Sequence, residues 1–146
     1  MEIVTKRLTY LCDTIPPLLT AIDEESFSTK ISPGKWSKKE IIGHLIDSAT
    51  NNHQRFVRTQ FENKPAIVYD QNKWNAFNFY QQISGQQIIS FWTIYNRQLI
   101  ELIRHSPKAN LQFECRVGEK LLALDFLITD YVKHLEHHLK QVVIYW

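Results

Sequence analysis

Two histidines one helical turn apart are the residues whose types and spacing point most directly to chemistry. They belong to the run His134-Leu135-Glu136-His137-His138. Helical residues four positions apart have Cβ atoms about 6 Å apart, so His134 and His138 could converge on one metal ion. His137 falls with the charged residues of the same helix and is expected to face water. The spacing therefore predicts a pair of imidazoles on the flank of this helix's apolar face.

A second set of polar residues falls on one face of a helix predicted to begin at Ser37. Its members are His44, Asp47, Asn51 and Arg55. Solvent-facing helix positions more often carry Lys and Glu than these shorter or more directional groups. The face could therefore line a polar cleft, in which Arg55 could bind a carboxylate of a ligand. Helical spacing alone leaves open the alternative that His44 and its neighbours face bulk solvent.

Four predicted helices position these side chains, because turn-forming residues near 32–34, 63–65 and 106–107 divide the chain. The helices are expected at residues 2–21, 37–61, 86–105 and 120–144. A short helix is expected at 74–80 and an extended piece at 111–117. Pro16 and Pro17 should kink or split the first helix. The pattern predicts one domain, residues 1–146, built as an all-α four-helix bundle with one long crossover.

Capping and amphipathic patterns support the second and fourth helices. Ser37 and Glu40 form a capping box, Trp36 precedes it as an apolar staple, and Lys38 and Lys39 are expected to be solvated. The buried stripe of the second helix is predicted to be Ile42, Leu45, Ile46, Ala49, Phe56 and Val57, with His53 as a core histidine. The stripe of the fourth is predicted to be Leu124, Ile128, Tyr131, Leu135, Leu139 and Val142.

The composition narrows the classes of function. The 146 residues include 17 basic and 15 acidic side chains, interspersed along the chain, which argues against nucleic-acid binding. No apolar run approaches the roughly 20 residues of a membrane helix, and the amino-terminal residues do not resemble an export signal. Cys12 and Cys115 match no zinc or redox spacing. We expect a cytoplasmic domain with two reduced thiols.

Two segments of the sequence are similar to the signatures of the DinB-like superfamily. Residues 34–48, around His44, resemble its second-helix motif. Residues 131–141 resemble its fourth-helix motif, a His-x-x-x-His pair followed by a Gln. The resemblance implies an up-down-down-up bundle, frequently a homodimer. It also implies a divalent metal ion held by His44, His134 and His138.

Three imidazoles would suit zinc or nickel, with iron or copper as alternatives, and would leave a coordination position open. Asp130 lies one turn before His134 and Glu40 one turn before His44, so each could accept the second N–H of a ligand histidine. An ordinary ion pair is the favoured interpretation for Glu40. Asp47 and Asn51 are further candidates for contact with the ion's water or with a substrate.

The resemblance extends to relatives that use bacillithiol, mycothiol or glutathione in transferase or isomerase reactions. It therefore implies an enzyme that activates a low-molecular-weight thiol or a water for transfer to, or hydrolysis of, a small molecule. The alternative is a non-catalytic metal-binding or stress-response protein in which the ion ties two helices together. A metal-free bundle with exposed histidines is a third possibility. The motifs do not identify the substrate.

Overall fold

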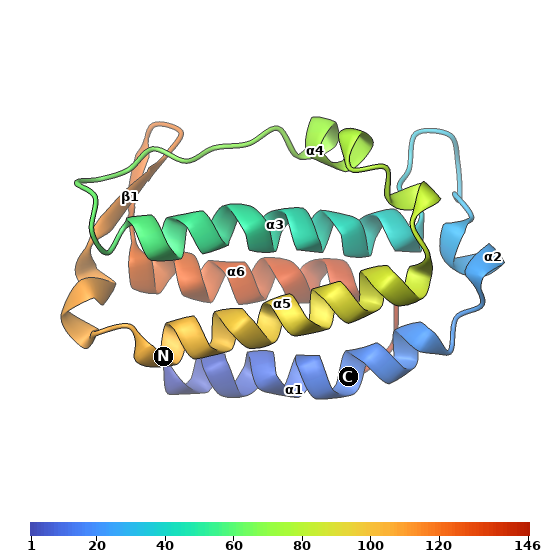
Figure 1. The fold of residues 1–146 in the computed structure, drawn as a ribbon, viewed down its shortest axis with the longest axis horizontal. Coiled ribbons are helices and arrows are strands. Elements are labelled where there is room, and N and C mark those ends of the chain that lie inside the picture. Colours follow the sequence, from blue (N-terminus) through green and yellow to red (C-terminus); the bar gives the residue numbers. More distant parts are fainter.

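The computed structural model describes all 146 residues and shows four long helices packed side by side (Figure 1). They are α1 (Glu2–Thr20), α3 (Lys38–Arg58), α5 (Gly85–His105) and α6 (Leu124–Leu139). The colour gradient of Figure 1 shows that α1 and α6 run in one direction and that α3 and α5 run in the other. The predicted four-helix bundle with up-down-down-up order is therefore confirmed.

Helices that follow one another in sequence do not all pack together. α1 and α3 each pack against both α5 and α6, so α1 and α3 occupy opposite corners of the bundle. α3 consequently has α6 as a neighbour, although 90 positions separate the residues that meet between them. This pairing lets histidines from the two sequence motifs approach one another.

The parallel direction of α3 and α5 requires a long return segment. α3 has 21 residues and, at 1.5 Å per residue, spans about 32 Å. Residues 59–84 make this return and include α4 (Gln71–Phe77) and the short 3-10 helix η1 (Tyr80–Gln82). The crossover runs along α3, and both α4 and η1 pack against that helix (Figure 1). It therefore covers part of the polar face of α3.

The fourth helix is shorter than the predicted 120–144. It begins at Leu124 because the preceding residues form an antiparallel hairpin, β1 (Glu114–Val117) and β2 (Lys120–Ala123). Gly118, with φ of +62°, supplies the left-handed backbone of the tight turn. The helix ends at Leu139, just before a β-branched run beginning at Val142, which has weak helix propensity. The extended piece predicted at 111–117 corresponds to β1 preceded by the 3-10 helix η2 (Lys108–Gln112).

Other boundaries also differ from the sequence pattern. α3 ends at Arg58 instead of residue 61, and α4 begins three residues before the predicted 74 because Asp70 caps it. The added helix α2 (Glu24–Ser28) is capped in the same way by Asp23. α1 continues through Pro16 and Pro17 without splitting.

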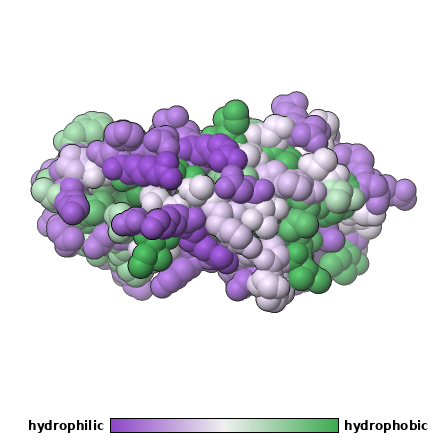
Figure 2. All heavy atoms as spheres, turned by 90° about the horizontal axis from the view of Figure 1, so that it is seen from below, coloured by the Kyte–Doolittle hydropathy of each residue, from purple (hydrophilic) through white to green (hydrophobic).

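The core is formed by the predicted apolar stripes. All six residues predicted as the stripe of the fourth helix are buried, although Val142 follows the end of α6. Five of the six predicted on α3 are buried, and Val57 is the exception. His53 is half-buried, and its Nδ1 lies 3.0 Å from the hydroxyl of Tyr95, so it has the expected partner. Viewed from the side of α1, polar side chains cover much of the surface and apolar ones form separate patches (Figure 2). None of the helices has the length and hydropathy needed to cross a membrane.

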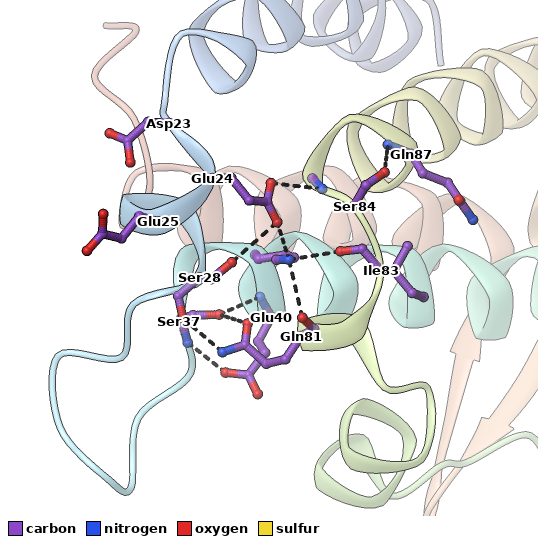
Figure 3. A network of polar contacts seen from close by, with 12 residues as sticks. Asp23, Glu24, Glu25, Ser28, Ser37, Glu40, Gln81, Ile83, Ser84 and Gln87 are labelled. Atoms are coloured by element: carbon purple, nitrogen blue, oxygen red, sulfur yellow. Dashed lines mark hydrogen bonds and ion pairs between the residues drawn. The ribbon is translucent and has the colours of Figure 1, made fainter.

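A polar network joins the start of α3 to α2 and to the end of the crossover (Figure 3). The capping box of Ser37 and Glu40 is present as predicted. Lys39, expected in solvent, is instead only 2% exposed. Its Nζ donates to the Ile83 carbonyl at 2.8 Å and to the carboxylate of Glu24. The network thus fixes three segments around one buried ammonium group.

Close approach of the crossover to α3 depends on a glycine. A Cβ atom added at Gly43 would lie 2.2 Å from the ring of Tyr80, which is buried. Tyr80 belongs to η1, so the missing side chain of Gly43 makes room for this turn directly beside His44. The crossover is therefore seated by packing as well as by hydrogen bonds.

The Lys39 network predicts that Lys39→Met lowers the free energy of unfolding by on the order of 2 kcal/mol, because buried carbonyl groups lose their donor. Lys38→Met is the matched control, since Lys38 is half-buried and has no hydrogen bond or ion pair of its own. Urea unfolding of the two variants measures the difference. Equal stabilities would contradict the structural role of the network.

The contact between Gly43 and Tyr80 predicts that Gly43→Ala is destabilising by about 1–3 kcal/mol through overpacking. In an open helix the same change would stabilise by about 1 kcal/mol, so the sign is diagnostic. Gly34→Ala is the control, because no atom lies within 4 Å of the added Cβ. Thermal unfolding compares the variants, and a more stable Gly43→Ala protein would disprove the close contact.

Candidate metal centre

The structure brings three histidines from two helices together. His44 projects from α3, and His134 and His138 project from successive turns of α6. The Nε2 atoms of His44 and His134 are 3.3 Å apart, and one nitrogen from each ring lies within 4.8 Å of the other two. The ring centroids are 4.6–5.1 Å apart. These three side chains could hold a metal ion.

The spacing of the nitrogens suits a common ligand. Two imidazole nitrogens each about 2.0–2.1 Å from a tetrahedral zinc ion would be separated by about 3.3 Å. The observed 3.3 Å between His44 and His134 is also compatible with a hydrogen bond between two neutral rings. A hydrogen bond, however, would use only two of the three converging rings.

All three imidazoles are held in the neutral form. Burial, together with the neighbouring His134 and His138, lowers the pKa of His44 to about 3. Burial likewise lowers the pKa of His134 to about 4 and shifts that of His138 downward. Neutral imidazole, with a free lone pair, is the form that binds metals.

His44 is enclosed, contrary to the solvent-facing alternative that the sequence left open. Its side chain is 0% exposed, and Trp36 lies against the ring with centroids 4.9 Å apart. Trp36, predicted only as a staple, therefore covers one side of His44. His137, by contrast, is exposed as predicted.

Two buried ring nitrogens of the histidine cluster have no hydrogen-bond partner in the protein. Nδ1 of His44 and Nδ1 of His138 are both buried without a hydrogen bond from the protein. Glu40 instead completes the helix cap and pairs with Lys30, the ordinary ion pair that was favoured for it. Asp130 makes no hydrogen bond to His134, although its charge raises the pKa of that ring slightly. Its role beside a ligand histidine stays a prediction.

Asp47 is hydrogen-bonded to the crossover, whereas Asn51 is hydrogen-bonded within α3. Asp47 is buried, and its Oδ1 accepts hydrogen bonds from the Tyr80 hydroxyl at 2.6 Å and from the Asn78 amide at 2.9 Å. Asn51 donates to the Asp47 backbone carbonyl. The second carboxylate oxygen of Asp47 is buried without a partner. Asp47 therefore connects α3 to the crossover, and contact of Asp47 or Asn51 with an ion or substrate stays a prediction.

A small hollow of about 130 Å³ opens beside the cluster, between α3, α6 and the crossover. It is lined by Ser48, Asn52, Arg55, Tyr69, Asp130, Tyr131 and His134. The sequence interpretation included Arg55 and Asp130 but missed Ser48, Asn52 and Tyr69. Ser48 and Asn52 follow His44 at intervals of four residues, so helical spacing could have placed them on the same face as His44. Tyr69 reaches the hollow from the crossover, and no sequence pattern indicated its position.

The sequence model of the DinB superfamily matches residues 7–142. The chain belongs to the DinB superfamily. It is 24% identical over 127 residues to YfiT of Bacillus subtilis, and 30% identical over 77 residues to a protein of Bacillus mycoides. Both relatives carry the name of a presumed metal-dependent hydrolase. The alignment with YfiT covers 82% of this DinB-superfamily chain and 68% of YfiT. The alignment with the Bacillus mycoides protein covers 50% of this chain and 44% of that protein.

Solved structures share the fold of this DinB-superfamily protein. YfiT, described as a probable metal-dependent hydrolase with an unusual four-helix bundle topology, superposes with a TM-score of 0.87 at 18% identity, covering 97% of this chain and 82% of YfiT. A mycothiol-dependent maleylpyruvate isomerase superposes with a TM-score of 0.79 at 11% identity, covering 97% of this chain and 60% of the isomerase. At these identities the likeness extends to the fold alone.

The environment of Asp47 predicts a pH-dependent stability. Burial raises its pKa from 3.8 to about 6, so the folded protein binds this proton more tightly than the unfolded chain does. The stabilisation is complete below about pH 3.8 and is lost as the pH rises through 6. Relative to wild type, metal-free Asp47→Asn should therefore gain on the order of 3 kcal/mol between pH 4 and pH 7.5. Urea unfolding at both pH values measures this, with Asp130→Asn as an exposed control; a difference independent of pH would contradict the prediction.

Proposed function

We propose that this protein is a metal-dependent enzyme that holds a divalent ion, zinc or nickel, with His44, His134 and His138. The observation that carries the proposal is the convergence of three neutral imidazoles next to a polar hollow. Three protein ligands leave a coordination position open, which is the arrangement of catalytic metal sites. The substrate is a small molecule, because the adjoining hollow measures about 130 Å³.

A divalent ion with an open position lowers the pKa of a water or thiol and so supplies a nucleophile at neutral pH. The surrounding side chains would bind and orient the substrate. Asp130 is the one carboxylate among the seven residues that line the hollow, and it is exposed. It is therefore the group available to accept the proton that the nucleophile releases.

The names of the relatives support two versions of the reaction. The description of YfiT supports hydrolysis by water, and that of the isomerase supports use of a thiol cofactor. We favour hydrolysis as the first version to assay, because YfiT has the higher sequence identity and the higher TM-score of the two. A homodimer in the cytoplasm and the absence of a nucleic-acid partner are further parts of the proposal.

A non-catalytic role is the second candidate, because the three histidines come from both α3 and α6. An ion bound across these helices would stabilise the folded state by mass action. The two candidates predict different effects of metal removal on stability. If the ion is structural, its removal should destabilise the fold, whereas if it is catalytic, the protein should stay folded without it.

The proposal predicts about one metal ion per chain in purified protein and at least tenfold weaker binding in His138→Ala, because one of three ligands is lost. His137→Ala is the matched control, since His137 is adjacent in sequence but exposed. Elemental analysis after dialysis, followed by zinc titration against a chelating dye, measures both quantities. Equal zinc affinity in wild type and His138→Ala would eliminate the proposed site. A large fall in melting temperature after chelation would favour the structural role of the ion. A small fall would favour the catalytic role.

A further inference from the structure

Arg55 is a half-buried cation that forms no ion pair. Four of the six arginines have a carboxylate within 4 Å: Arg7, Arg58, Arg97 and Arg104. Arg116 is exposed to water. Arg55 is half-buried, lines the hollow beside His134, and has no carboxylate within that distance. Asp130 lines the same hollow but forms no ion pair with Arg55, so the partly desolvated guanidinium is incompletely compensated and can accept an anionic ligand.

Neutral groups hold the guanidinium in place. Nε and Nη2 of Arg55 donate to the Ile67 carbonyl at 3.3 and 3.0 Å, and Nη1 lies 3.4 Å from Oδ1 of Asn52. A guanidinium has five N–H donors, so one on Nη1 and one on Nη2 remain free. Two free donors on a planar fork match the geometry of a carboxylate.

The rest of the hollow selects the size and charge of the ligand. Its volume of about 130 Å³ is similar to that of a cavity of about 150 Å³ that holds one benzene molecule, which is enough for a carboxylate with a few carbons. Tyr69 adds a hydroxyl whose pKa is raised by burial, so it remains a donor. Asp130 also lines the hollow, and its negative charge disfavours a dianion such as phosphate more than a monoanion.

We propose that Arg55 binds the carboxylate of a small organic acid, with the remainder of that molecule directed toward His134. The assignment of this acid as the substrate rests on the proposed function; the anion site itself does not, because it is built from Arg55 and its neighbours. Arg55, at one end of the hollow, would thus select substrates that carry a negative charge. The histidine cluster, at the other end, would hold the ion that acts on the bound substrate.

The probes are propionate and its neutral counterpart propionamide, titrated into full-length protein labelled with ¹⁵N. The arginine Nε–H resonances report binding, since Arg55 is one of six arginines and can be assigned with Arg55→Gln. We expect millimolar binding of propionate, at least tenfold weaker binding of propionamide, and at least tenfold loss of propionate affinity in Arg55→Gln. Arg58→Gln is the matched control on the same helix, because Arg58 is paired with Glu62, and it should bind as wild type does.

A metal-free arm separates this site from the metal centre. The same titration with His138→Ala stripped of metal should retain binding that depends on Arg55, whereas a carboxylate bound only through the ion would be lost. Equal affinity for propionate and propionamide, or wild-type affinity in Arg55→Gln, would overturn the proposal. Retained binding in a protein that takes up no metal would support the anion site while refuting the metal-dependent enzyme.

Discussion

Burial of the polar face of α3 determines which groups the crossover and α6 must place against that helix. His44, Asp47 and Asn51 are almost completely removed from water, and buried polar groups are costly without partners. The crossover supplies partners at two positions of this face: Tyr80 and Asn78 donate to Asp47, and the Ile67 carbonyl accepts from Arg55. A crossover that served only to connect α3 to α5 would not need hydrogen-bonding groups at these positions.

The partners that the protein does not supply are concentrated in one place. Of the five buried side-chain atoms without a hydrogen bond, three belong to His44, Asp47 and His138. Buried polar groups in native proteins are almost always satisfied by protein, water or a ligand. The clustering of unsatisfied atoms on and beside the histidines therefore supports a centre that is completed by groups other than the polypeptide, such as an ion and ordered water.

Periodicity predicted the helices and their buried stripes well because bundle helices bury one regular face. The same reasoning failed where local turn chemistry took over, at the hairpin before Leu124 and at the Asp70 cap of α4. The site was predictable in part: the four-residue spacing identified His134 and His138, and the family motif added His44. The crossover determined the rest. It buried Asp47 and brought Tyr69 to the hollow, and a single-helix projection contains no information about a segment that packs from another part of the chain.

X-ray absorption spectroscopy of the zinc-loaded protein would show whether His44, His134 and His138 bind one ion together. We expect three imidazole nitrogens at about 2.0–2.1 Å, with one or more water oxygens completing the shell, and loss of one imidazole in His138→Ala. A spectrum with fewer than three imidazoles in the wild-type protein, or one unchanged by His138→Ala, would contradict this expectation.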